Sequence, residues 1–253
     1  MYQRGPHIRS TFPLEDGRAA TDGGLAIPGV AGTGAPVRLD FLAPGGATTG
    51  RLLPSGAAID RLDVPGVGPI DVSMVDAANA CVFVRARDLG LTGRELPEEL
   101  ERDTALLEKL QAIRCEASVA MGIAKDEAEA RSIAAVPIIG CVAPPMDSAT
   151  LSGDPITAAF VDLTARFLSN GQPHRALPLT ASLCTAVAAR IAGTLVAEAL
   201  AAGPGLQLRI GMPSGILTVG ADVGQEDGQW VARSGAFYRT ARRLFDGRIY
   251  VPR

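Results

Sequence analysis

The chain has 253 residues, 47% of them hydrophobic, and a formal net charge of −3. This length is sufficient for one large or two modest domains with a sizeable core. The nearly neutral charge excludes the broad basic surface that binding to nucleic acid or to an anionic membrane requires. An acidic substrate would therefore have to be held by a local site.

Composition also bounds the architecture and the compartment. The 29 glycines, 18 prolines and 4% aromatic residues predict short strands joined by many tight turns. Two histidines without clustered ligands predict no structural metal. Residues 1–21 are polar and interrupted by glycine and proline, unlike a secretory signal. Four widely spaced cysteines, with no Cys-x-x-Cys motif, are interpreted as reduced core residues of a cytoplasmic protein: Cys81, Cys115, Cys141 and Cys184.

The first 35 residues are unusual for the beginning of a domain. Turn signals at Asp16-Gly17 and Asp22-Gly23 separate weak strand candidates, and no apolar run precedes residues 25–27. They are either a frayed terminus or the last strands of a domain whose beginning is absent. Residues 35–42 then alternate with period two, which predicts a strand.

The middle of the chain alternates between short apolar runs and charged stretches. Asp76 and Asn79 lie between two predicted strands and are either turn formers or ligand contacts. An amphipathic stretch over residues 96–121 predicts a surface helix. Further elements are predicted as strands at 70–74, 81–84 and 136–142, a short polar helix at 125–131, and a strand or helical turn at 160–167.

Residues from about 179 to 200 are almost wholly apolar, with Arg190 and Glu198 as their only charged side chains. A helix that is apolar on all sides is buried, and Arg190 with Gly203-Pro204 leaves too short a run for a membrane span. We therefore predict a helix through the centre of a domain. Either it is a plain core helix, or its N-terminal N–H groups and positive dipole end hold a carboxylate.

Strands follow the predicted helix to the end of the chain. Runs at 206–211, 216–219 and 230–242 precede a final hairpin onto 249–251. Because the helices are grouped between hairpin-connected strands, the class is α+β, with a curled, mostly antiparallel sheet around the central helix.

Several sequence blocks occur together in a defined order, which is more specific than any one of them. They are residues 72–86, residues 88–97, His174-Arg175-Ala176, Ile191-Ala192-Gly193-Thr194, residues 209–215, residues 239–244 and Val251-Pro252. Together they resemble the PrpF family, the 2-methylaconitate cis-trans isomerases. Its relatives include 3-methylitaconate Δ-isomerase and 4-oxalomesaconate tautomerase.

The resemblance implies a diaminopimelate-epimerase-like fold, with two similar domains and a cleft between the N-termini of their central helices. Residues 1–50 would then be the remnant of the N-terminal domain, and residues 51–253 a complete C-terminal domain. The Lys and Cys expected as acid/base groups in the first domain have no counterpart. The chain's lysines, Lys109 and Lys125, lie on the charged helical layer.

The resemblance also implies a substrate site in the half that is present. Its predicted substrate-binding residues are Asn79, Arg175, Thr180, Ala181, Ser182, Ser214 and Gly215. His174 is a candidate base, or else a surface or capping residue, and Pro213-Ser214-Gly215 could be a simple turn. Met212 stands where the family often has His, and Ala181 where it commonly has Gly.

Other reactive or charged residues have plainer interpretations. Cys184 is interpreted as a core residue, because its thiol would stay protonated without a neighbouring base. Arg239, Arg242 and Arg243 are either salt-bridged strand ends or anion contacts.

The function implied is cofactor-independent proton transfer, a cis-trans or double-bond isomerisation of small unsaturated di- or tricarboxylates such as 2-methylaconitate. The alternative is a truncated, non-catalytic fragment that binds a carboxylate or complements a partner; a plain interaction module is a third hypothesis. No cofactor, metal, nucleic acid or membrane is expected. The expected partners are the small carboxylate and either a second copy of the chain or a separate N-terminal half.

Overall fold

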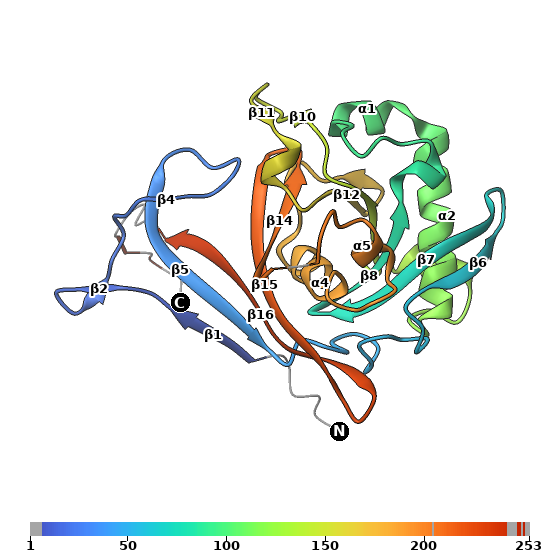
Figure 1. The fold of residues 1–253 in the computed structure, drawn as a ribbon, viewed down its shortest axis with the longest axis horizontal. Coiled ribbons are helices and arrows are strands. Elements are labelled where there is room, and N and C mark those ends of the chain that lie inside the picture. Colours follow the sequence, from blue (N-terminus) through green and yellow to red (C-terminus); the bar gives the residue numbers. More distant parts are fainter. Residues whose placement is uncertain (1–6, 204, 242–246, 249, 251–253) are drawn as a thin grey trace.

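A computed structural model describes residues 7–203, 205–241, 247–248 and 250. One large curled sheet wraps around a short buried helix, and further helices lie outside the sheet (Figure 1). The strands of the sheet are, in spatial order, β1 (His7–Thr11), β5 (Thr33–Leu42), β16 (Gln229–Ala241), β15 (Gly215–Glu226), β14 (Gln207–Met212), β12 (Leu163–Ser169), β9 (Ile138–Ala143), β8 (Asn79–Arg85), β7 (Gly68–Ala77) and β6 (Asp60–Val64).

Shorter strands attach to this sheet or pair apart from it. β13 (Gln172–Pro173) pairs with β12, and β4 (Leu25–Ala26) pairs with β5. Two separate pairs are β2 (Leu14–Glu15) with β3 (Arg18–Ala19) and β10 (Ser148–Ala149) with β11 (Pro155–Ile156). Most neighbours are antiparallel, while β8–β9 and β12–β14 are parallel. The predicted α+β class with a mostly antiparallel sheet is confirmed.

The central helix is α4 (Leu179–Ala188), and every residue from Ala181 to Ala188 is buried. β16 approaches it closely, because a Cβ on Gly235 would lie 2.6 Å from Cγ of Leu183. The prediction of a buried helix inside the sheet is confirmed.

The predicted length of this helix, about 179 to 200, is wrong. α4 ends at Ala188, and a separate turn of helix, α5 (Leu195–Glu198), follows. Thr194 Oγ1 donates to the carbonyls of Ala188 and Ile191, and Gly193 adopts φ +88°. This left-handed glycine and local hydroxyl bonding break the helix where the apolar pattern alone continues.

Residues 43–53 close the gap between β16 and β7. The Ala43 N–H donates to the Arg233 carbonyl at 2.9 Å, and the Gly46 N–H to the Asp76 carbonyl at 2.7 Å. Asp76 is fully buried, and its carboxylate accepts the backbone N–H groups of Thr48 and Thr49. The role of Asp76 is therefore to anchor this closing segment within the sheet.

The opposite face of β7, β8 and β9 carries a second core, covered by α2 (Thr104–Ala120). The stretch predicted as a single helix over 96–121 is two, since α1 (Pro97–Arg102) ends before Asp103. The Asp103 carboxylate accepts the Leu106 N–H and so caps α2. The polar helix predicted at 125–131 is α3 (Glu127–Ser132).

The predicted element at 160–167 begins as a 3₁₀ turn, η2 (Ala158–Phe160), and continues as β12. Another 3₁₀ turn, η1 (Ala86–Leu89), follows β8. The strand predicted at 136–142 begins at Ile138. The hairpin predicted onto 249–251 lies outside the described residues, apart from residues 247–248 and position 250.

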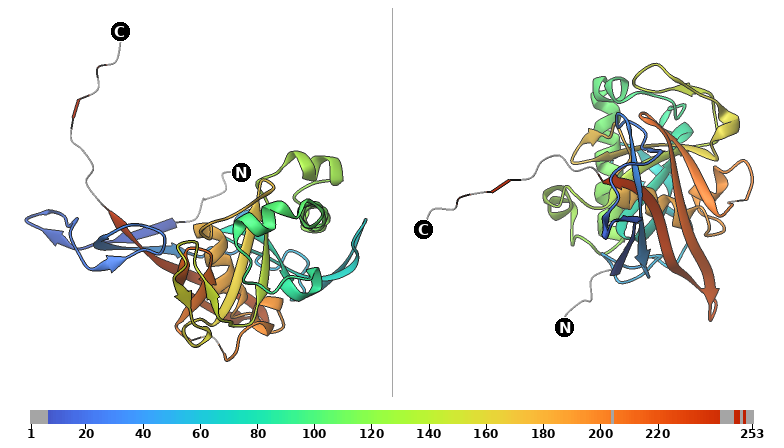
Figure 2. Two further views of the ribbon diagram at one scale, coloured as in Figure 1. Left: turned by 90° about the horizontal axis from the view of Figure 1, so that it is seen from above. Right: turned by 90° about the vertical axis from the view of Figure 1, so that its left-hand side faces the viewer.

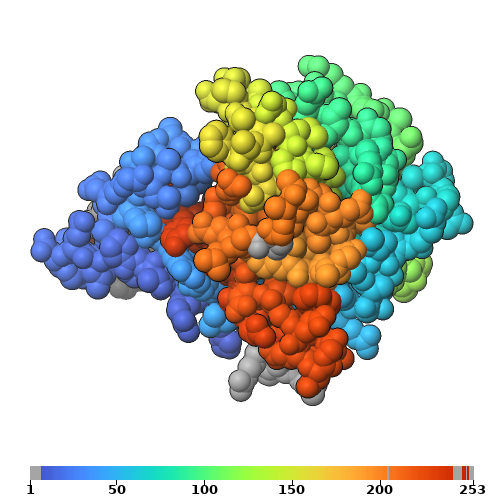
Figure 3. Space-filling model, viewed as in Figure 1, coloured from blue at the N-terminus to red at the C-terminus, as the bar shows by residue number. Residues whose placement is uncertain are grey.

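Residues 7–42 form, with the far half of β16, a wing that projects from the body (Figure 2). The space-filling view shows them as a lobe beside the body (Figure 3). The register pairs Ala35 with Ala241 and Leu42 with Ser234. Ile8, Phe12, Leu14 and Val30 on this wing are exposed.

Candidate functional site

The N-terminus of α4 carries unpaired hydrogen-bond donors. Pro178 is its N-cap and provides no side-chain cap, and the first helical N–H, that of Ser182, donates to the Pro178 carbonyl at 2.9 Å. Among the described residues, the N–H groups of Leu179, Thr180 and Ala181 have no partner. Unpaired N–H groups at the positive end of a helix suit a carboxylate.

Asn79 lies next to this helix end. A turn at Ala78, with φ +60°, makes Asn79 the first residue of β8. Its Nδ2 donates to Oγ1 of Thr180 at 3.4 Å. The structure thus brings together two predicted site residues that lie far apart in the sequence.

The turn between β14 and β15 lies at the same end of the helix. Pro213 and Ser214 form this two-residue turn, and Gly215 adopts φ +133°. The Leu177 N–H donates to Sδ of Met212 at 3.4 Å, which ties the turn to the segment that enters α4. Ser214 Oγ is buried and has no partner within the described part of the chain.

Residues of the wing pack onto this turn, a contact that the sequence did not predict. A Cβ on Gly215 would lie 3.0 Å from Cβ of Pro28, and one on Gly29 would lie 3.0 Å from Cβ of Ser214. Positive φ at both glycines permits this close approach. The sequence signals at this contact are the pair Pro28-Gly29 and the glycine that follows Pro213-Ser214.

The Ser182 hydroxyl points into the helix itself. Its Oγ donates to the Leu179 carbonyl at 2.7 Å. The groups of the predicted cradle that lack such an internal bond are the three N–H groups and the Thr180 hydroxyl. The structure therefore gives Ser182 a local role in the first turn of α4.

His174 and Arg175 have partners on other elements. His174 Nε2 and Ser169 Oγ are 2.6 Å apart, and burial lowers the pKa of the imidazole. Arg175 forms a 2.8 Å ion pair with Glu98 on α1. Their partners lie on β12 and α1, so these two residues tie the segment that enters α4 to those elements.

The cysteines are buried and free. The Cys184 thiol donates to the Val75 carbonyl at 3.3 Å. Burial, with a smaller contribution from Cys184, raises the pKa of Cys81. Both lysines are exposed, Lys109 on α2 and Lys125 before α3. Neither the thiols nor the lysines supply a reactive group at the α4 N-terminus.

Of Arg239, Arg242 and Arg243, the structure describes Arg239. It lies on β16, and burial lowers the pKa of its guanidinium. Arg242 and Arg243 lie outside the described residues.

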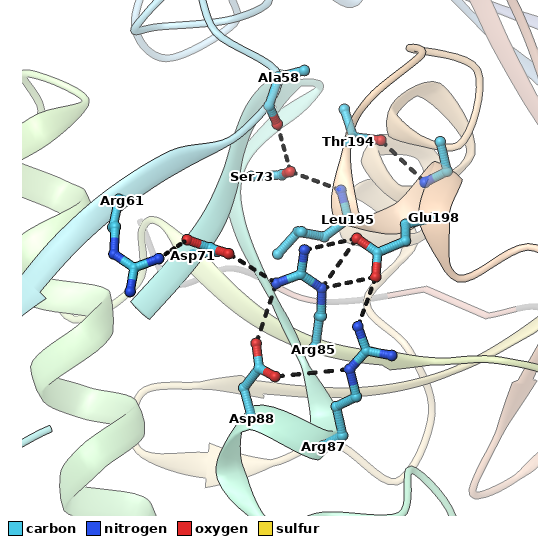
Figure 4. Close-up of polar contacts among 11 residues, drawn as sticks. Ala58, Arg61, Asp71, Ser73, Arg85, Arg87, Asp88, Thr194, Leu195 and Glu198 are labelled. Carbon is cyan, nitrogen blue, oxygen red and sulfur yellow. Dashed lines mark hydrogen bonds and ion pairs between the residues drawn. The ribbon is translucent and has the colours of Figure 1, made fainter. Parts of the chain in front are cut away.

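The other end of the α4–α5 path carries a charged network (Figure 4). Nε and Nη2 of Arg85 bind the Glu198 carboxylate at 2.7–3.1 Å, and Arg87 binds it at 2.9 Å. Nη1 of Arg85 contacts Asp71 at 3.2 Å and Asp88 at 3.3 Å. The hydrogen bond from Arg85 lowers the pKa of Glu198. With Arg61, which binds Asp71 at 3.1 Å, three cations face three carboxylates. Their ion pairs stabilise this end, which also borders a cavity lined in part by Arg85, Arg87 and Glu198.

Two features are absent from the described residues. None of their helices combines the length and apolarity that crossing a bilayer requires. Their His, Cys, Asp and Glu side chains nowhere form a group of three suited to a metal ion.

The amino-acid sequence of this chain is similar to those of known proteins. Residues 3–252 match the family described as PrpF protein. The chain is 37% identical over 252 residues to 2-methyl-aconitate isomerase of Shewanella oneidensis, covering 98% of this chain and 64% of that protein. It is 40% identical over 250 residues to 3-methylitaconate isomerase of Eubacterium barkeri, with 98% and 64% coverage.

A solved structure shares the fold. The crystal structure of methylitaconate-delta-isomerase superposes with a TM-score of 0.88 at 38% identity, covering 97% of this chain and 63% of that one. This chain therefore spans less than two thirds of the length of the relatives it matches.

Proposed function

The chain belongs to the PrpF family, and we propose that it forms the carboxylate-binding half of a cofactor-independent isomerase. Its substrates would be small unsaturated di- or tricarboxylates such as 2-methylaconitate. The observation that carries this proposal is the N-terminus of α4, where the free N–H groups of Leu179, Thr180 and Ala181 lie beside Asn79. The names of the relatives support the same substrate class.

The proposed reaction removes a proton from a carbon next to a carboxylate and returns it elsewhere on the allylic system. Such a transfer requires a base, an acid and donors for the enolate-like charge. The N–H groups of α4 would hold one carboxylate, and the Asn79 amide would orient it. The Ser214 hydroxyl would donate from the opposite side of the site.

Under this proposal, neither Cys184 nor His174 is the main acid or base. Cys184 is buried among core residues, and Nε2 of His174 is engaged with Ser169 Oγ at 2.6 Å. We propose that the proton-transferring groups come from a region equivalent to the third of the relatives' length that this chain does not match. Residues 1–50 would then belong to that other domain, and residues 51–253 would be the complete one.

The second candidate function is that of a non-catalytic, complementing fragment. It is favoured by the wing, where every residue of β1 is exposed and Ile8 and Leu14 are 52% and 66% exposed. Apolar side chains of this kind mark an interface. A separate N-terminal half or a second copy of the chain would cover them. The four free, buried cysteines support a cytoplasmic location for either function.

The test follows proton exchange by NMR in deuterated solvent, with 2-methylaconitate and 3-methylitaconate as probes. The chain alone is expected to bind them, with shifts at the Leu179–Ala181 amides, but to exchange no protons. Adding the N-terminal portion of a relative is expected to restore deuterium incorporation. Exchange by the chain alone would place the acid and base here, with His174 tested first. The absence of both binding and complementation would contradict the proposal.

A further inference from the structure

Arg166 on β12 is a buried cation held by backbone carbonyls. Only 2% of it is exposed, and burial lowers its pKa to about 10. Its Nε donates to the Glu95 carbonyl at 2.6 Å, while Nη1 donates to Ala165 at 2.9 Å and Gly211 at 3.3 Å. Among the described residues, Nη2 has no partner and no carboxylate forms an ion pair with it. Burying a guanidinium in this way is costly, so its position requires an explanation.

Arg166 lies where one edge of β12 changes its partner strand from β14 to β13, a place called the fork below. One edge of β12 pairs with β9, so the other edge carries both β14 and β13. β14 pairs only with Leu163 and Thr164, and β13 only with Leu168 and Ser169. Arg166 lies between these two pairings, and its guanidinium reaches across to Gly211 where the ladder with β14 has ended.

The two segments that form the candidate site, the turn at Pro213-Ser214 and the entry to α4, both begin next to this fork. Gly211 directly precedes Met212 and the turn at Pro213-Ser214. The segment from β13 into α4 starts on the other side of the fork and returns to Met212 through the Leu177 N–H. The contacts of Arg166 therefore lie at the base of both the turn and the entry to α4.

The contact of Arg166 with the Glu95 carbonyl connects the fork to the segment that lies outside the sheet. Glu95 belongs to the segment before α1, and its carboxylate accepts the N–H groups of Thr92 and Gly93. α1 in turn carries Glu98, the partner of Arg175 in the segment that enters α4. A single guanidinium thus joins the outer segment, β12 and the end of β14.

We propose that Arg166 is a positioning residue for the carboxylate site. It sets the separation between the Pro213-Ser214 turn and the N-terminus of α4, without contacting the ligand itself. This role rests on the proposed function of that site.

The chain contains a matched control in Arg114 on α2. Arg114 is also 2% exposed, and it donates to the carbonyls of Ala130, Ile133 and Val136. Burial lowers its pKa as well. Its partners, which include Gln111 and Cys115 on α2 itself, belong to α2, to α3 and to the residues after α3. Arg114→Lys therefore has the structural cost of altering a buried arginine without altering the fork.

The experiment compares the Arg166→Lys and Arg114→Lys variants of the full chain by two readouts. The first is the set of backbone amide shifts of Leu179–Ala181, Ser214 and Gly215 in the free protein. The second is the dissociation constant for cis-aconitate, used as the probe. Arg166→Lys is expected to move these amide signals and to weaken binding by roughly tenfold, since small displacements of positioned groups have large effects. Arg114→Lys is expected to lower Tm comparably, with unchanged site amides and binding within about twofold of the original.

The readouts separate this proposal from the proposed function. Amide shifts at the site that are no larger in Arg166→Lys than in Arg114→Lys would overturn the positioning role. If the unaltered chain does not bind cis-aconitate, the proposed function of the site fails, and the amide shifts still decide the role of Arg166. If Arg166→Lys does not fold, Arg166→Met is measured against Arg114→Met by the same two criteria.

Discussion

Two backbone N–H groups at the start of α5 are hydrogen-bonded, whereas the first three of α4 are not bonded within the described part of the chain. At the α5 end, Thr194 accepts the Ala197 N–H, and the Ser73 hydroxyl accepts the Leu195 N–H at 2.9 Å. At the start of α4, three N–H groups have no partner among the described residues. The satisfied end contributes stability, whereas the start of α4 leaves donors that would hold a ligand under the proposed function. Such local departures from full satisfaction are expected at functional sites.

The largest effect that would test this contrast is expected from Thr180→Asp. A carboxylate in the first turn of α4 would engage the free N–H groups and stabilise the helix by about 0.3–1 kcal/mol. It would also repel a bound carboxylate, by about 2–3 kcal/mol for charges roughly 6 Å apart at an effective dielectric constant of 20. Binding should therefore weaken at least about 30-fold while Tm stays the same or rises.

Thr180→Asn is the matched control, because it has nearly the same shape as Asp without the charge. Titration calorimetry with 2-methylaconitate and thermal unfolding would be run on both variants. Equal loss of binding in Asn and Asp would show that shape or the contact with Asn79, rather than helix-end charge, governs the site.

A smaller effect is expected from Arg85→Met at the α5 end, where stability should fall while carboxylate binding stays unchanged. The Arg85 side chain is 16% exposed and faces three carboxylates, on Asp71, Asp88 and Glu198. Removing the cation leaves like charges close together, but their partial exposure reduces the cost to about 2 kcal/mol. Urea unfolding should show this loss, with carboxylate binding unchanged in the folded protein. A change in affinity instead would mean that the two ends are coupled.

A somewhat smaller loss, of about 1–2 kcal/mol, is expected from Ser73→Ala. The Ser73 hydroxyl donates to the Ala58 carbonyl at 2.6 Å and accepts the buried Leu195 N–H. Alanine leaves that N–H without a partner, which costs more than the average hydrogen bond contributes. Ser73→Cys, of similar size, provides the comparison in the same unfolding experiment. Equal stability of Ser73→Ala and the original chain would show that this buried N–H finds another partner.

The sequence was sufficient for the outline of the closed core but not for its details. Apolar runs located the strands and the buried helix, because buried segments consist mostly of apolar residues. The end of α4 depends on Gly193 and on the Thr194 hydroxyl, which a count of apolar residues does not register. The break at Asp103 was visible in principle, since Asp is a favoured N-cap.

The candidate site was predictable only in part. Helix-start signals and the family resemblance indicated Thr180, and the structure adds its contact with Asn79. The inward hydrogen bond of Ser182 depends on side-chain rotation, which sequence does not determine. The fork at Arg166 depends on which strands share an edge of β12, and such long-range pairing has no local signal.

The smallest expected effect is the pH dependence of stability that His174 contributes. This residue has a hydrogen-bonding partner, as groups at the α5 end do, but it lies in the segment that enters α4. Burial lowers the pKa of its imidazole below the unfolded value of about 6.5. As pH falls from 7 through that value, the unfolded chain takes up a proton that the folded chain resists, so stability decreases. His174→Gln should remove this contribution, because Gln can still bond to Ser169 and does not titrate. Urea midpoints from pH 7.5 to 5 should therefore fall more steeply for the original chain than for the variant. Parallel curves would mean that the His174 ring is as free to protonate in the folded protein as in the unfolded chain.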